Sequence, residues 1–188
     1  ICINQQDLEE RGRQVRLIGK IFSRARRVIL WVGPKSEDSD LAMDCISMIA
    51  SRVKVQWQTT QLYPITNESH WADHDVPLPL SDMEYAALFC FYSRSWFKRL
   101  WVWQEVYLAA DALLLCGARS VHWKAVRRGV LCLGLKPRPG MVEWPAPEAA
   151  FSICAFVMTE NYLLSDLLHE TKDSSCSDPR DKVYALLS

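Results

Sequence analysis

The run Val28-Ile29-Leu30-Trp31-Val32 is the feature that most restricts how this chain can fold. It is apolar throughout, and Gly33-Pro34 follows it directly. This pattern is typical of a strand that is covered on both faces in a parallel sheet and is stopped by turn residues. The sequence therefore predicts a buried strand over residues 28–32.

The segment before this strand predicts a helix. Asp7 and Glu10 have the spacing of a capping box, and the helix is expected to run to about Ala25. Before it, residues 1–3 are apolar and indicate the end of another buried strand. Strand, helix and strand in this order indicate a βαβ unit.

The remaining chain continues the alternation of helices and strands, and 188 residues suit one domain. A second strand is expected over 112–116 and a long surface loop over 55–80. Further helices are expected to begin at polar capping residues, namely Ser39, Ser81 with Glu84, Ser95, Ser120 and the segment 178–181, and one or two more between 147 and about 170. The predicted fold class is α/β, helix-rich, with a short and mainly parallel sheet.

Charge and cysteine content exclude several classes of protein. Lys plus Arg equals Asp plus Glu at 22 each, which gives no reason to expect binding to nucleic acid or to an anionic membrane. The longest apolar run, residues 149–158, is too short to span a bilayer, which needs about 20 residues. The seven cysteines are odd in number and form no CxxC pair, which favours a reducing, cytoplasmic compartment.

The stretch SWFKRLWVWQE at 95–105 is the main candidate for a functional site. On one helix, Trp101 and Glu105 would share a face, and aromatic walls would raise the pKa of the carboxylate. Such an acid can stabilise an oxocarbenium-like ribose while an indole stacks on a planar base. The alternative is that Glu105 forms an ion pair with Arg99 and that the tryptophans are core.

Nearby polar residues leave two interpretations each. Arg94, Lys98 and Arg99 either receive a diphosphate or a partner's acids, or form a solvated helix face. Asn4, with Gln5, follows the first predicted strand, where ligands gather in parallel sheets.

Three other polar groups have a simpler explanation. Asp7 is explained by its role as a cap. Asp178-Pro179-Arg180-Asp181 is either an interaction motif or a helix start in which Arg180 bridges to a distant carboxylate, and a structural role is favoured. His70 and His74, with Asp73, have the i, i+4 spacing at which two histidines on one helix can bind a metal, but no third strong ligand is nearby, so no metal is expected.

Three phrases resemble a known family. They are ICINQQDLEERGRQVRLIGKIFSRARRVILWVG at 1–33, RSWFKRLWVWQEVYLA at 94–109 and DPRDKVYALL at 178–187. In this order they closely resemble the signature blocks of the fungal heterokaryon incompatibility (HET) domain. The resemblance implies a death-inducing domain of nonself recognition that works through protein partners or self-association and is often joined to sensor or repeat domains.

The resemblance extends over residues 1–188, but two family phrases do not occur. Family members carry an earlier Ser-Tyr…Trp-Gly block and a Trp-Ile-Asp-Ala lead-in before the equivalent of Ile1. We therefore expect a partial HET domain that lacks its N-terminal strand block and has little activity by itself.

A more distant resemblance is to TIR domains, which have flavodoxin-type α/β folds. Their late helix carries a Trp-Cys-x-x-Glu signature, and here Trp101 and Glu105 match it while Val102 replaces the cysteine. In catalytic TIR domains that glutamate cleaves the nicotinamide–ribose bond of NAD. The resemblance implies Glu105 as the candidate catalytic residue and NAD as a candidate substrate, with no cofactor. A non-enzymatic assembly module is the alternative.

Overall fold

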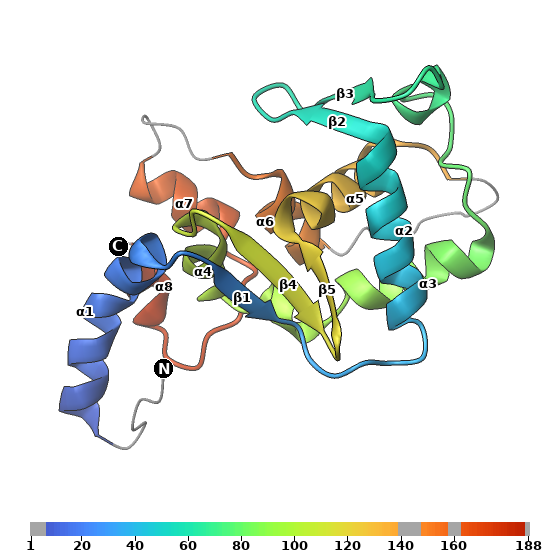
Figure 1. The fold of residues 1–188 in the computed structure, drawn as a ribbon. Coiled ribbons are helices and arrows are strands. Elements are labelled where there is room, and N and C mark those ends of the chain that lie inside the picture. The colour runs from blue at the N-terminus through green and yellow to red at the C-terminus, as the bar shows by residue number, and fades with distance from the viewer. Residues whose placement is uncertain (1–6, 139–147, 158–162, 187–188) are drawn as a thin grey trace.

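A computed structural model describes residues 7–138, 148–157 and 163–186 (Figure 1). The strand expected over residues 1–3 lies outside these ranges, so the βαβ unit stays a prediction. Helix α1, Leu8–Arg24, agrees with the predicted bounds. Asp7 caps it, because its side chain accepts hydrogen bonds from the backbone N–H groups of Glu9 and Glu10 at 3.0 and 2.9 Å.

Three strands form a mixed sheet in the order β1-β4-β5. They are β1 (Val28–Trp31), β4 (Ala112–Cys116) and β5 (Arg119–His122). The α/β class is confirmed, with β1 parallel to β4 and β4 antiparallel to β5. The expected mainly parallel sheet is thus half antiparallel, because Gly117, at φ 56°, turns the chain straight from β4 into β5.

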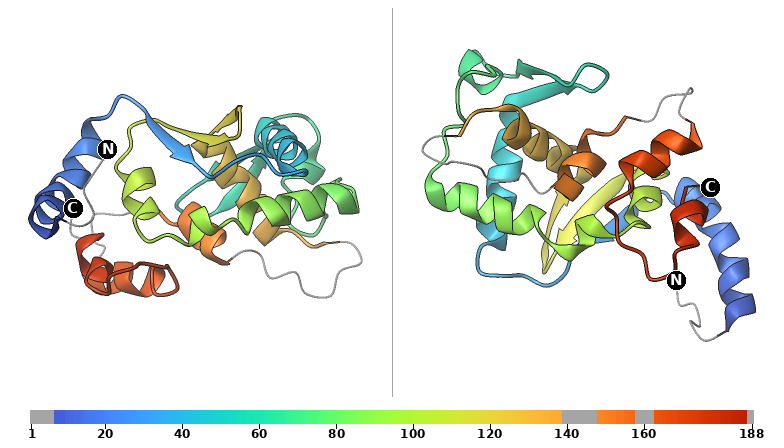
Figure 2. Two further views of the ribbon diagram at one scale, coloured as in Figure 1. Left: turned by 90° about the horizontal axis from the view of Figure 1, so that it is seen from below. Right: turned by 180° about the vertical axis from the view of Figure 1, so that it is seen from behind.

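The prediction of a strand covered on both faces was wrong for β1. Leu30 and Leu114 are fully buried, whereas Ile29 and Trp31 are 50% and 49% exposed. Helices lie along one side of this sheet, and its other side is open in the described part of the chain (Figure 2). The sequence did not distinguish these cases, since Ile29 and Trp31 are as apolar as their buried neighbours.

The segment between β1 and β4 contains most of the core. It consists of α2 (Ser39–Arg52), the antiparallel hairpin β2 (Val53–Gln56) and β3 (Gln61–Pro64), the 3-10 turn η1 (Ser69–Trp71), α3 (Asp82–Tyr92), the 3-10 turn η2 (Ser95–Lys98) and α4 (Val102–Tyr107). The expected loop over 55–80 is therefore partly a hairpin. The capping box of Ser81 and Glu84 is confirmed, with the Ser81 N–H 2.7 Å from the carboxylate.

The C-terminal part contributes α5 (Trp123–Leu135), α6 (Glu148–Ala155), α7 (Leu164–Glu170) and α8 (Asp181–Tyr184). Helix α5 begins at Trp123 rather than at Ser120, because Ser120 lies in β5 and His122 is the cap. Helix α5 approaches α3 closely at Gly129, where an added Cβ would lie 2.6 Å from the Tyr92 hydroxyl. That hydroxyl donates to the Val126 carbonyl at 2.9 Å, and burial raises the pKa of Tyr92.

Cysteines of the described segments are free and mostly buried. Burial raises the pKa of Cys45 and of Cys132 to about 12, so these thiols act as small apolar groups. Among the helices described, none combines the length and the apolar content that a membrane span requires.

Candidate functional site

The stretch 95–107 is not the single helix that the sequence predicted. Ser95 opens the 3-10 turn η2 instead of capping a helix, Arg99 is extended, and α4 begins at Val102. The cause is a contact distant in sequence. Leu100 donates its N–H to the Ser175 carbonyl at 2.9 Å, and Ser175 donates its N–H to the Lys98 carbonyl at 2.6 Å. This two-bond bridge holds the backbone of Arg99 extended.

The tryptophans of this stretch are anchored in the protein. Trp96 and Trp103 are buried, and Trp96 packs edge-on against Phe97 and Trp123. The Trp103 indole donates to the Ser174 hydroxyl at 3.2 Å. The interpretation of these two rings as core is therefore confirmed.

The second and third sequence blocks meet at α4. Trp101 donates its indole N–H to the Asp181 carboxylate at 3.1 Å, and Gln104 donates its amide to the Ala185 carbonyl at 2.8 Å. Lys182 donates to three carbonyls of the segment 171–174. Trp101 and Gln104 thus position the C-terminal helix α8, a long-range contact that no local sequence pattern indicates.

Glu105 forms the ion pair with Arg99 that the alternative interpretation expected, at the long distance of 3.9 Å. The Glu105 N–H bonds to the Trp101 carbonyl at 3.3 Å, so the two residues lie one helical turn apart as expected. Its side chain is only 17% exposed, and the Arg99 guanidinium lies 3.9 Å away and is 56% exposed. Burial raises the pKa of Glu105, and the positive charge of Arg99 opposes this only in part.

Helix α4, which carries Glu105, lies at the end of the sheet where β1 and β4 begin (Figure 1). Two pockets in the described part do not include it. One of about 380 Å³ is lined by Arg26, Arg27 and Asp111, and another of about 570 Å³ is lined by residues of α6 and of the segment 169–173. Asn4 and Gln5, the other predicted binding residues, lie outside the described residues.

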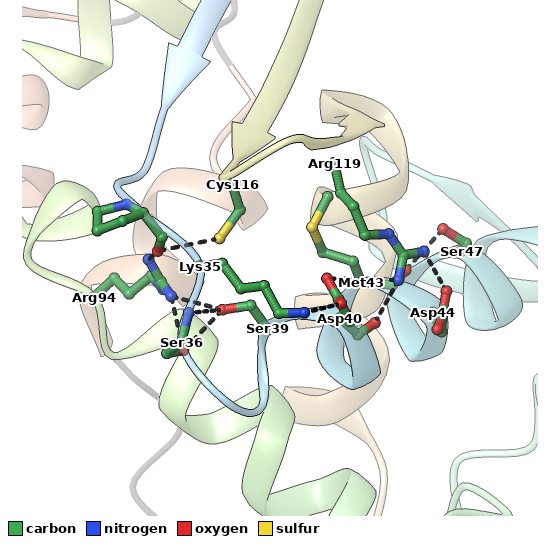
Figure 3. Close-up of polar contacts among 11 residues, drawn as sticks. Lys35, Ser36, Ser39, Asp40, Met43, Asp44, Ser47, Arg94, Cys116 and Arg119 are labelled. Atoms are coloured by element: carbon green, nitrogen blue, oxygen red, sulfur yellow. Dashed lines mark hydrogen bonds and ion pairs between the residues drawn. The ribbon is translucent and has the colours of Figure 1, made fainter.

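The opposite end of the sheet, where β1 and β4 end, is held by Arg94 (Figure 3). Its guanidinium donates to the carbonyls of Val32 and Pro34 at 3.2 and 2.9 Å, and to the hydroxyls of Ser36 and Ser39 at 2.9 and 2.8 Å. Neither a diphosphate site nor a solvated helix face describes this position. Arg94 fixes the loop between β1 and α2 instead.

Ion pairs surround the same loop. Lys35 bonds to Asp40 at 2.5 Å, and Arg119 bonds to the Asp44 carboxylate (Figure 3). The hydrogen bond that the Arg119 guanidinium donates stabilises the ionised Asp44 carboxylate and lowers its pKa. These charges neutralise one another at the carboxyl end of the parallel strands.

The remaining sequence candidates have structural roles. Arg180 bonds to Asp178 within its own motif at 2.7 Å rather than to a distant carboxylate. Helix α8 starts at Asp181, so Pro179 precedes it and is not its first residue. Around His70 the 3-10 turn ends at Trp71, so the assumed helical spacing to His74 is not formed. Within the described residues, no three metal-binding side chains come together.

The contact between Trp101 and Asp181 allows a direct test of how the blocks are joined. We expect Trp101→Phe and Asp181→Asn each to lower the free energy of unfolding, with a coupling energy of about 1 kcal/mol in a double-mutant cycle followed by denaturant unfolding. Trp57→Phe, paired with the same Asp181→Asn, is the control and should show no coupling. Additive effects of Trp101→Phe and Asp181→Asn would mean that this hydrogen bond does not hold α8.

Comparison with known proteins identifies the family of this chain. The family model described as "Heterokaryon incompatibility protein (HET)" matches residues 1–105. The chain is similar to "Heterokaryon incompatibility protein 6, OR allele" of Neurospora crassa, at 28% identity over 229 residues, covering 100% of this chain and 33% of that protein. The chain therefore spans about a third of the length of this relative. No solved structure matches.

The match to the family model includes the first block, Arg94 and the stretch that ends at Glu105. It covers more than half of the 188 residues. The chain belongs to the heterokaryon incompatibility (HET) family.

Proposed function

We propose that this chain is the cell-death-inducing module of a longer, cytoplasmic fungal protein that acts in nonself recognition after cell fusion. Membership of the HET family supports this role, as does the similarity over the whole chain to heterokaryon incompatibility protein 6 of Neurospora crassa. In the parent protein, other domains would sense the partner and this domain would respond.

For the mechanism, we propose cleavage of NAD with Glu105 as the catalytic residue. The observation that carries this proposal is a carboxylate with 17% exposure whose ion pair to Arg99 is 3.9 Å long. A largely buried acid with so weak a partner lowers stability, and such groups are common at functional sites. Arg99, more than half exposed, is placed to accept a phosphate of the substrate.

The proposed reaction is hydrolysis of the nicotinamide–ribose bond. The C1′–N bond breaks, and nicotinamide leaves with the electron pair of that bond. Water adds to the ribose carbon and releases one proton, so NAD and water give ADP-ribose, nicotinamide and a proton. The ionised Glu105 would stabilise the positive charge on the ribose as the bond breaks.

A second candidate is a module that works only by assembly. The hydrogen bond between Trp101 and Asp181 favours it, because an indole anchored in the fold is less available to stack on a substrate. In this case Glu105 would belong to the scaffold, and death would follow from self-association or from binding of a partner.

The two candidates differ in what happens to NAD before cells die. The full-length parent protein is expressed from an inducible promoter in a fungal host, and viability, NAD, nicotinamide and ADP-ribose are measured over time. We expect NAD to fall before viability and the two products to rise equally. Death at constant NAD would favour assembly alone, and survival of cells that contain the folded protein would contradict the proposed role.

A further inference from the structure

The outer face of the sheet presents four apolar side chains to solvent. Ile29 and Trp31 are 50% and 49% exposed on β1. In the register of the parallel pair, Ile29 lies beside Leu113 and Trp31 lies beside Leu115. Both leucines are partly exposed, because paired residues in a sheet point to the same side. We call these four residues the outer patch.

The outer patch is unusual for an α/β domain. Parallel strands are generally covered on both faces, since each face is apolar. Here the helices lie against the face that contains Leu30 and Leu114, and no described helix lies over the other (Figure 2). A contiguous exposed apolar area on a soluble domain marks an interaction surface.

The shape of the outer patch fits one helix. The four side chains lie on two neighbouring strands, which are about 5 Å apart. On each strand the two side chains are two residues apart, which is about 7 Å. A helix about 10 Å in diameter covers such an area with residues at i, i+3 or i+4, and i+7. An amphipathic helix is therefore the element that completes this layer.

The charges beside the outer patch are positive at one end. Arg27 and His122 share the single carboxylate of Asp111, at 2.5 and 2.8 Å. Arg26 lines one surface pocket together with Arg27 and Asp111, and Arg24 ends α1 two residues before it. Both arginines are exposed, and no ion pair to either is found among the described residues. At the other end of β1, the cations Lys35 and Arg119 are already paired with carboxylates. A helix with acidic residues at its flanks could form ion pairs with Arg24 and Arg26.

A two-fold pairing, in which this face meets the same face of a second copy, does not supply those acids. The acid on this face, Asp111, already pairs with Arg27 and His122. Such a pairing would therefore place no free acid of the described part of this face beside Arg24 and Arg26.

We propose that the outer patch binds an amphipathic helix of a protein partner, with its apolar side on Ile29, Trp31, Leu113 and Leu115 and acidic residues toward Arg24 and Arg26. This surface is independent of the chemistry at Glu105 and assigns a partner class that the proposed cell-death role leaves open. The test below uses binding alone, so its outcome is separate from that of the NAD experiment.

The test uses two labelled synthetic peptides of about 18 residues, long enough to form a helix. Both have the same leucine face; one has glutamate flanks and the other lysine flanks. Binding to residues 1–188 is measured by fluorescence anisotropy at low and moderate salt. We expect the glutamate peptide to bind at least about 10-fold more tightly, with a preference that decreases as salt rises.

Variants connect the binding to the outer patch. Trp31→Lys should lower the affinity for the glutamate peptide about 10-fold or more. Arg26→Glu should reduce or reverse the preference for the glutamate peptide over the lysine peptide. Met83→Lys is the matched control, because Met83 is an apolar residue on α3 that is 75% exposed. This variant should change neither the affinity for the glutamate peptide nor the preference between the two peptides. Circular dichroism verifies that the variants fold, and Ile29→Gln is a milder second variant of the same patch.

Two results would overturn the proposal. One is equal affinity for the two peptides, or unchanged binding by folded Trp31→Lys and Ile29→Gln. The other is that residues 1–188 form a dimer in sedimentation experiments that Trp31→Lys converts to a monomer, which would assign the patch to a second copy.

Discussion

Glu105→Gln should reduce the rate of NAD loss caused by the full-length parent protein by about 100-fold or more. Glutamine keeps the size of the side chain and removes the negative charge that would stabilise the ribose cation. The rate is measured as release of nicotinamide by the purified protein under conditions that allow self-association. We also expect cells that express this variant to survive.

The matched control for this experiment is Glu37→Gln. Glu37 is an exposed acid in the loop after β1, far from α4 in the chain, and its replacement should leave the rate unchanged. If Glu105→Gln kills as wild type does and NAD stays constant in both, the enzymatic mechanism is wrong and the domain acts by assembly.

Arg94→Ala should lower the free energy of unfolding by about 3 kcal/mol, measured by denaturant unfolding. The substitution removes the charged donor from four acceptors. Two of them are the carbonyls of Val32 and Pro34, which follow the buried end of β1 and would be left without this hydrogen bond. Arg94→Lys should recover only part of this loss, because an ammonium group cannot reach acceptors on both sides as a planar guanidinium does.

Lys98→Ala is the control for Arg94. Lys98 lies four residues later on the exposed side of η2, and its replacement should change stability by no more than about 0.5 kcal/mol. A loss below about 1 kcal/mol for Arg94→Ala would mean that the loop after β1 is held mainly by other contacts.

Local interactions explain what the sequence predicted well. Asp7 and the pair Ser81 and Glu84 begin their helices where expected, because a cap involves residues within three positions of each other. The α/β class and the strand over 112–116 follow from short apolar runs that end at glycine.

Contacts between distant residues explain what could not be predicted. The break at Arg99 depends on Ser175, and the position of Arg94 depends on carbonyls about sixty residues away. The strand β5 was missed because Ser120 resembles a helix cap, while its pairing opposite Leu115 decides its structure. Whether Ile29 and Trp31 are covered depends on which helices lie over the sheet, which composition does not encode.

The candidate site divides in the same way. The spacing of Trp101 and Glu105 on one turn follows from the sequence. The raised pKa of Glu105 also agrees with the expectation from the neighbouring aromatic residues. The hydrogen bond of Trp101 to Asp181 depends on the docking of α8, which no local pattern indicates.

The stability of Glu105→Gln between pH 4 and pH 7 tests most directly whether this acid is maintained for function rather than for the scaffold. Burial raises the pKa of Glu105 above the ordinary 4.5, so the folded state binds the proton more tightly than the unfolded state. The charged form therefore lowers stability above the raised pKa, and this loss disappears as the pH falls through that pKa toward 4.5.

We predict that Glu105→Gln at pH 7 has a free energy of unfolding equal to that of the wild type or up to about 1 kcal/mol higher, and that the difference decreases toward pH 4. A loss of about 2 kcal/mol or more at pH 7 would show that the ion pair with Arg99 supports the fold and would contradict the functional assignment of Glu105.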